Sequence, residues 1–125
     1  MRIIIASLIF LLTAVNTFAQ TTNSLPKSEK KALKQAKKLR KRLLKGADFN
    51  QLARKYSDDP GSGSVGGEMG RVQFGQFVPE YDSTVLALEV GKISEPFRTK
   101  FGYHLIELLG RNETTFTSRH ILIKP

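Results

Sequence analysis

Residues 102–125 read GYHLIELLGRNETTFTSRHILIKP, which is two apolar segments on either side of a polar turn. Each segment carries one histidine, His104 in the first and His120 in the second, and the chain has no other histidine. In the second segment isoleucines alternate with other side chains, as expected of a strand that is covered on two faces. A lone histidine in such a strand is usually a hydrogen-bonded core residue, so the pair needs an explanation from the rest of the chain.

The segment from residue 27 to residue 56 reads KSEKKALKQAKKLRKRLLKGADFNQLARKY and predicts two helices. In the first, apolar residues recur at helical spacing, and lysine and arginine fill the other faces. Ser28 is the expected N-cap of this helix and Gly46 its expected stop. Asp48 is the expected N-cap of the second, shorter helix. The apolar stripe of the first helix consists of Ala32, Ala36, Leu39 and Leu43.

Glycine and serine are frequent between Gly61 and Gly70, which predicts a loop. A phosphate-binding loop is rejected because the closing Lys-Ser or Lys-Thr pair and the flanking strand and helix are missing. The expected elements after the loop are a strand at 70–74, a helix at 78–88, and strands at 95–99, 102–111 and 117–124. This order of helices and strands is typical of an α+β fold with an antiparallel sheet.

The first 20 residues, MRIIIASLIFLLTAVNTFAQ, have the layout of a secretory signal peptide. One cation precedes an apolar run from Ile3 to Val15, and small residues precede a cut after Ala19. A membrane anchor is the alternative, but the run is shorter than the ~20 apolar residues that spanning requires. We therefore expect an exported protein, periplasmic or secreted, from which residues 1–19 are removed. The sequence has no cysteine to carry a lipid or to form a disulfide.

The formal charge of the chain is +9, and most of it lies on the first expected helix. A solvated amphipathic helix that covers a sheet is the simplest explanation of this charge. Nucleic-acid binding is disfavoured because no aromatic residue alternates with the cations for base stacking. Weak contact with an anionic membrane surface is the remaining possibility for this helix.

Several spaced motifs carry a resemblance to a known family. They are GADFNQLARKYSDDPGS at 46–62, GGEMG at 66–70, FGQFVPEY at 74–81 and GKISEPFRTKFGYHLIELLGR at 91–111. In this order they resemble the parvulin family of peptidyl-prolyl cis/trans isomerases, over about residues 32–111. The resemblance implies a parvulin-like (FKBP-like) fold, in which helices surround an antiparallel four-stranded sheet. It also implies an isomerase that assists the folding of exported proteins.

Parvulins begin with a strand of the form RHILV that carries an active-site histidine, whereas the matching RHILIKP stands last in this sequence. In the parvulin fold the first and last strands are antiparallel neighbours. A turn at RNETTFT therefore predicts that residues 118–124 pair with residues 103–109. We interpret the chain as a circular permutant, with a linker at 20–27 and one domain at 28–125. A truncated foldase with a second module and an exchange of this strand between two chains are the alternatives.

The resemblance also implies the catalytic residues, which form a network of two histidines, a carboxylate near the substrate carbonyl and supporting hydroxyl groups. These residues are His104, His120, Asp59, Thr99 and Ser57. Asp58, the neighbouring aspartate of the SDDP motif, is the alternative candidate for the carboxylate, and we prefer Asp59. Rotation about a prolyl amide makes and breaks no covalent bond, so we expect neither a cofactor nor a metal.

The same motifs imply a proline-binding pocket made of Met69, Gln76, Phe77 and Tyr81. Two positions depart from the family pattern. Tyr81 stands where Phe is usual and adds a hydroxyl group at the pocket, and Val72 stands where an aromatic residue is common. The loop before GGEMG has no basic cluster, which argues against specificity for phosphoserine-proline.

Two other functions remain as alternatives. A Ser/His/Asp hydrolase is disfavoured because the chain has no G-x-S-x-G turn to present a nucleophile. A binding module is the alternative from another class: an ATP-independent holdase of parvulin fold that grips unfolded exported polypeptides with little or no isomerase activity. For the isomerase and for the holdase we expect a monomer whose partners are unfolded or proline-containing exported chains.

Overall fold

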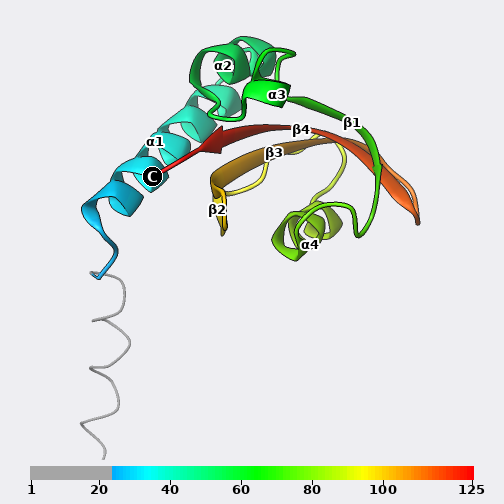
Figure 1. Cartoon of the computed structure of the whole chain (residues 1–125). Coiled ribbons are helices and arrows are strands. Elements are labelled where there is room, and N and C mark those ends of the chain that lie inside the picture. The colour runs from blue at the N-terminus through cyan, green and yellow to red at the C-terminus, as the bar shows by residue number, and fades with distance from the viewer. Residues whose placement is uncertain (1–23) are drawn as a thin grey trace, which may run out of the picture.

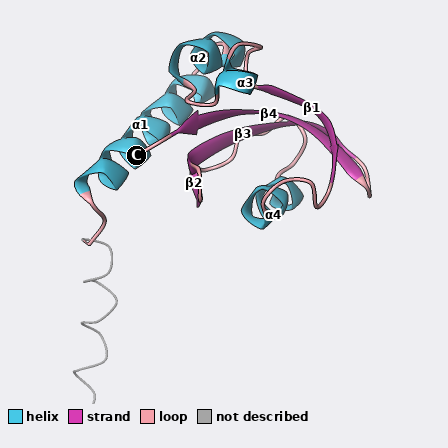
Figure 2. Ribbon diagram, viewed as in Figure 1, coloured by secondary structure: helices cyan, strands magenta, loops and turns pink. Residues whose placement is uncertain are grey.

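The computed structural model describes residues 24–125, and the expected signal peptide with its cut after Ala19 lies outside this part. The elements of the described chain (Figures 1 and 2) are α1 (Lys27–Leu44), α2 (Phe49–Tyr56), α3 (Pro60–Gly63), β1 (Glu68–Gln73), α4 (Pro79–Ala87), β2 (Phe97–Thr99), β3 (Gly102–Arg111) and β4 (Thr115–Ile123). The expected α+β class is confirmed. Among residues 24–125, no helix combines the length and the apolar composition needed to cross a bilayer.

The four strands form one sheet in the order β1-β4-β3-β2, and every neighbouring pair is antiparallel. The last strand of the chain therefore lies inside the sheet, between β1 and β3. Its register with β3 is regular from Tyr103 opposite Ile123 to Leu108 opposite Ser118, and after a shift it continues to Arg111 opposite Phe116. The antiparallel hairpin that the sequence predicts at the end of the chain is thus confirmed.

One face of the sheet is covered by α1 and α2 (Figure 1). Side chains of neighbouring strand residues point to opposite faces, so Leu105 of β3 and Ile121 of β4 both point to this side. Both side chains are buried in the core cluster that the helices close. The stripe predicted for the first helix is buried in the same cluster, through Ala32, Ala36, Leu39 and Leu43.

The other face of the sheet is covered by α4, which lies beneath the curved sheet in Figure 1. Tyr81 and Val85 of this helix pack against Ile106, Leu108 and Phe116 in a second core cluster. The helix has 9 residues, half of the 18 in α1, so it covers less of its face. The helix expected at 78–88 is confirmed, with its proline in the first turn.

One of the two helix starts differs from the start that the sequence predicts. The N-cap of α1 is Pro26 and not Ser28, which lies inside the first turn. The carbonyl oxygen of Pro26 accepts the first helical hydrogen bond, and proline has no N–H to leave unsatisfied there. Asp48 caps α2 as predicted, because its side chain accepts the backbone N–H of Gln51 at 3.1 Å.

The glycine-rich segment from Gly61 to Gly70 is not the continuous loop that its composition predicts. Part of it belongs to α3 and part to β1. Gly67 lies between them with a φ of 85°, and a Cβ at this position would come within 2.4 Å of the His120 carbonyl oxygen. Glycine is therefore required where the segment passes over β4. The His120 N–H donates to the Gly67 carbonyl at 2.8 Å and fixes the segment there.

Deletion of residues 117–125 is expected to unfold the protein, because it removes the strand that joins β1 to β3. Burial of Ile121, Leu122 and Ile123 contributes roughly 1.5–3 kcal/mol each, against a total stability of about 5–15 kcal/mol. Thermal unfolding of the complete and the shortened protein, followed by circular dichroism, measures the effect. Cooperative unfolding of both at the same temperature would mean that β4 is dispensable.

Candidate active site

His104 of β3 and His120 of β4 lie side by side on the face of the sheet that α4 partly covers. The register pairs His104 with Leu122 and His120 with Ile106, so the two histidines are diagonal neighbours across the hairpin. Their rings stack with centroids 5.4 Å apart, and their Nδ1 atoms are 3.3 Å apart. Each residue is only 4% exposed. The hairpin therefore places the two imidazoles in direct contact.

The segment after α2 brings a carboxylate to His120. The Oδ2 atom of Asp59 lies 2.8 Å from His120 Nε2 and accepts the hydroxyl hydrogen of Ser62 at 2.6 Å. The Oγ atom of Ser62 lies 2.9 Å from the same ring nitrogen. Sequence reasoning missed Ser62, although it follows Asp59 by three residues, the spacing at which a side chain meets a helix N-cap.

The second histidine is held by a threonine at the end of β2. Thr99 Oγ1 lies 2.6 Å from His104 Nε2 and accepts the backbone N–H of Phe101 at 3.2 Å. Thr99 is buried, and it pairs with Gly102 in the tight connection between β2 and β3. The threonine that the family resemblance implies is thus in contact with the histidine pair.

The donors and acceptors of this network fix one pattern of hydrogens. An ionised Asp59 only accepts, so His120 Nε2 carries a hydrogen and donates it. The free Nδ1 of His120 then accepts from His104 Nδ1–H, and His104 Nε2 accepts from the hydroxyl of Thr99. While both imidazoles are neutral, every polar hydrogen in this series of hydrogen bonds has an acceptor. If both rings gained a proton, the Nδ1–H groups of His104 and His120 would face each other.

Burial keeps both imidazoles in this neutral form. It lowers the pKa of His104 to about 4, and the neighbouring His120 adds to the effect. It also lowers the pKa of His120, against partial opposition from Asp59. Burial alone would raise the pKa of Asp59, but the hydrogen bonds from Ser62 and His120 outweigh it and hold that pKa below its usual value. At neutral pH the network therefore holds one anion and two neutral rings.

A pocket of about 470 Å³ opens beside the network, and both histidines line it. The rings of Phe77 and Tyr81 form an aromatic wall, edge to face with centroids 4.9 Å apart. The Tyr81 ring also lies 6.1 Å from the His104 ring and 5.9 Å from the His120 ring. The residues expected for proline binding all line this pocket: Met69, Gln76, Phe77 and Tyr81.

The two departures from the family pattern have small effects on this pocket. The hydroxyl of Tyr81 is hydrogen-bonded to Ser118 Oγ at 2.7 Å. It is therefore engaged by the protein and does not add a free polar group to the pocket. Burial raises the pKa of Tyr81 far above its usual value, which keeps the phenol protonated. Val72 packs with the second core cluster and does not line the pocket.

Ser57 and Asp58 hold the loop and do not join the network. Ser57 Oγ accepts the backbone N–H groups of Leu122, at 3.1 Å, and of Asp59, at 3.4 Å. Asp58 Oδ2 accepts the backbone N–H of Lys124 at 2.8 Å. These bonds dock the loop on the end of β4. The expected support of the histidines by Ser57 is therefore corrected to support of the backbone around Asp59.

The geometry does not fit a Ser/His/Asp hydrolase. In such a triad the serine and the carboxylate contact different nitrogens of the imidazole. Here Ser62 and Asp59 both contact His120 Nε2, and His120 Nδ1 is occupied by His104. Within residues 24–125, no group of three or more histidine, cysteine, aspartate and glutamate side chains is placed to hold a metal ion.

The sequence is similar to those of known proteins. The sequence model of the rotamase family, described as a PPIC-type PPIASE domain, matches residues 12–110. Chaperone SurA from Nitrosococcus oceani is 41% identical over 90 residues, which cover 72% of this chain and 21% of that protein. Foldase protein PrsA 4 from Bacillus cereus is 42% identical over 94 residues, which cover 75% of this chain and 32% of that protein. The chain thus spans a minor part of the length of these relatives.

Solved structures agree with the sequence comparison. The crystal structure of a peptidylprolyl isomerase (PrsA) from Bacillus cereus matches with a TM-score of 0.61 and 43% identity, over 66% of this chain and 32% of that chain. The PrsA structure from Bacillus anthracis matches with a TM-score of 0.57 and 29% identity, over 74% of this chain and 39% of that chain. The family match covers most of the sequence and the fold agrees, so this chain belongs to the PpiC-type (parvulin-type) rotamase family of peptidyl-prolyl cis/trans isomerases.

Proposed function

We propose that the protein is a peptidyl-prolyl cis/trans isomerase that assists the folding of exported polypeptides. One observation carries this proposal. A continuous series of hydrogen bonds, from Thr99 through the two neutral histidines to Asp59, lies along an apolar pocket. The pocket volume of about 470 Å³ lies in the range of small-ligand sites and suits a prolyl residue with its neighbours. Membership of the rotamase family supports the same activity.

The reaction needs a site that prefers a twisted amide. Resonance gives the prolyl C–N bond a rotational barrier of about 18–20 kcal/mol, and uncatalysed exchange takes tens to hundreds of seconds. An enzyme accelerates the exchange by binding the twisted amide better than either planar form. A twisted amide has lost resonance and part of its charge separation. The aromatic wall of Phe77 and Tyr81 therefore favours it over the more polar planar amide.

Asp59 has a role in this preference. Its lowered pKa keeps it ionised at neutral pH, and it lines the pocket. A planar prolyl amide has a negatively polarised carbonyl oxygen, which a nearby carboxylate repels. The repulsion falls as the amide twists, so the carboxylate lowers the barrier. Ser62 and His120 hold the carboxylate in place, and they are positioning residues in this proposal.

Export is part of the proposal. The N-terminal signal pattern supports a location in the periplasm or outside the cell after cleavage near Ala19. The partners in this proposal are unfolded or proline-containing exported chains. In this proposal residues 28–125 form one domain, in which β4 supplies the second histidine of the site. A holdase with the same pocket is the second candidate, supported by the name chaperone that the SurA relative carries. Turnover separates the two.

The purified protein is expected to accelerate cis/trans exchange of a short peptide with an apolar residue before proline. The rate should not change when a metal chelator is added, since the proposed mechanism uses no metal ion. A protease-free fluorescence or NMR exchange assay measures the rate. Exchange at the buffer rate with micromolar protein would reject the isomerase and favour the holdase.

Asp59→Ala is expected to lower kcat/KM about 100-fold, at the lower end of the range seen when one electrostatic group is lost from an active site. Its cost in stability should be only about 1 kcal/mol, since Ser62 still contacts His120. Urea unfolding measures that cost beside the exchange rate.

Asp58→Ala is the matched control for this substitution. It removes the hydrogen bond to the Lys124 N–H, so a loss of roughly 1 kcal/mol in stability is expected with little change in turnover. If Asp58→Ala abolishes turnover while Asp59→Ala is silent, the assignment of the carboxylate is wrong.

Lowering the pH from about 6.5 to about 4 is expected to destabilise the folded protein. In this window an unfolded histidine, with a usual pKa near 6.5, binds a proton that buried His104, with a pKa of about 4, does not. The free energy of unfolding therefore falls as the pH falls, by about 3 kcal/mol for this residue. The lowered pKa of Asp59 adds a loss only below its usual value of 3.8.

Urea unfolding at pH 7 and at pH 4.5 measures this dependence on pH. His104→Gln should reduce the dependence, because glutamine does not titrate and removes one of the two buried imidazoles. An unchanged dependence in this variant would contradict the neutral state of His104.

A further inference from the structure

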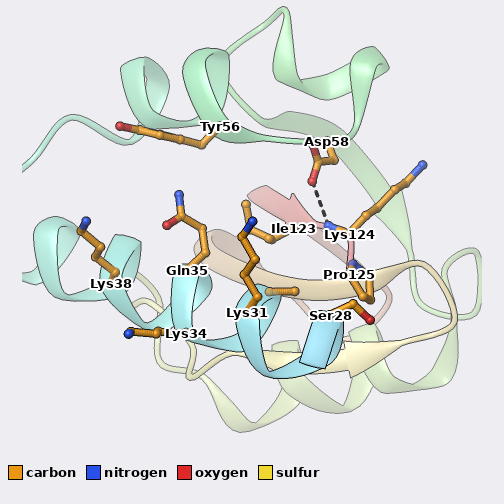
Figure 3. A pocket seen from close by; sticks show the side chains of 11 residues that line it. Ser28, Lys31, Lys34, Gln35, Lys38, Tyr56, Asp58, Ile123, Lys124 and Pro125 are labelled. Carbon is orange, nitrogen blue, oxygen red and sulfur yellow. Dashed lines mark hydrogen bonds between the residues drawn. The ribbon is translucent and has the colours of Figure 1, made fainter. Parts of the chain in front are cut away.

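A groove of about 740 Å³ lies between α1 and the segment after α2, beside the end of β4. Figure 3 shows its two sides. Lys31, Lys34 and Lys38 stand on α1, and Tyr56 and Asp58 lie on the opposite side. The groove is separate from the aromatic wall of the prolyl pocket.

The cations of this groove lack acidic partners. In the part of the chain that the structure describes, no carboxylate forms an ion pair with Lys31, Lys34 or Lys38. Arg40 on the same helix does have a partner, Glu95, at 3.1 Å. The three groove lysines are exposed, so a ligand reaches them without unfolding any element. Their unpaired charge is complementary to an acidic ligand.

The spacing of these lysines suits an extended polypeptide. Residues three and four apart in a helix share a face, so Lys31, Lys34 and Lys38 follow one another along the groove. A rise of 1.5 Å per residue separates the first from the last by about 10 Å. An extended chain covers that distance in about three residues, at roughly 3.3 Å each. The floor offers apolar contact for such a chain, since Ala32 and Ile123 line it.

The groove and the prolyl pocket share a wall. Asp58 and Lys124 line both of them, and the bond from the Lys124 N–H to Asp58 Oδ2 fixes this wall. A polypeptide with its proline in the pocket therefore passes into the groove by crossing a single pair of residues. An acidic segment close to the proline would reach the three lysines.

We propose that Lys31, Lys34 and Lys38 form an accessory subsite that binds an acidic segment of the substrate polypeptide near the isomerised proline. This inference rests on the proposed function, which places the X-Pro bond in the pocket. An anionic membrane is a weaker fit, because a flat surface would contact the outermost side of α1, here called the ridge, and not the side that lines the groove. The ridge includes Lys37 and Lys41, which do not line this groove.

Peptide binding tests the subsite independently of turnover. Two peptides each contain one Ala-Pro bond, one tryptophan and a run of three glutamates. In the first peptide the run ends two residues before the proline, and in the second it begins two residues after the proline. Matched peptides carry glutamines in place of the glutamates. Because the protein has no tryptophan, peptide fluorescence anisotropy reports binding without background.

Two triple variants separate the groove from the general charge of α1. Glutamine keeps the helix propensity of lysine and removes its charge. The groove variant combines Lys31→Gln, Lys34→Gln and Lys38→Gln. The control variant removes the same charge from the same helix outside the groove and combines Lys27→Gln, Lys37→Gln and Lys41→Gln.

We expect one glutamate peptide to bind about 3- to 30-fold more tightly than its glutamine partner, as the sum of three exposed ion pairs. The groove variant should lose this preference and the control variant should keep most of it, and 0.5 M salt should weaken it through screening. Exchange of the glutamine peptides should be equal in all three proteins.

Equal binding of glutamate and glutamine peptides would overturn the subsite. So would an equal loss of the preference in both variants, which would indicate general attraction to α1. Binding to vesicles of anionic phospholipid without a preference for the glutamate peptides would overturn it in favour of the membrane. Lysine-dependent peptide binding without any exchange of the glutamine peptides would reject the isomerase and leave the acidic subsite in place.

Discussion

The antiparallel pairing of β3 with β4 is the constraint on which the other features depend. Its register points Leu105 and Ile121 toward α1 and points His104 and His120 toward the opposite face. A slip of one residue would turn every side chain of β4 to the wrong face. It would bury the imidazole of His120 under α1 and expose the core isoleucines. The core and the candidate site therefore depend on the same hydrogen-bond ladder.

This pairing buries two titratable rings against one face of the sheet. Their burial is tolerated because every polar hydrogen of the network has a partner. Burying a polar group without a hydrogen bond costs several kcal/mol. Thr99 and Asp59 terminate the chain of bonds at its two ends, so neither imidazole has an unsatisfied nitrogen. The arrangement is complete with both rings neutral, and it is disrupted when both rings are protonated, because two N–H groups would then face each other. The folded state therefore depends on the protonation of the two rings.

The sequence predicts what repeats along the chain and misses what depends on contacts across the fold. Helical periodicity predicted the buried stripe of α1, and side-chain alternation predicted that β4 is a strand. Its pairing with β3 was predicted from the family resemblance and the turn before it. Spacing alone did not identify Asp59, whose importance came from the family resemblance. Ser62 was missed because its contact with His120 requires the turn of α3. The hydroxyl of Tyr81 was misread because its partner, Ser118, lies on a distant strand.

The unequal covering of the two sheet faces explains why the site opens where it does. The 18 residues of α1 close one face, whereas the 9 residues of α4 cover less of the other face, on which the pocket opens beside the buried histidines. The end of β4 forms the border between that opening and the lysine groove, since Asp58 and Lys124 line both. A chain crossing this border would leave an apolar, aromatic environment and enter a cationic one. The bonds that lock the end of β4 would then also set the distance from the proline at which a substrate meets positive charge.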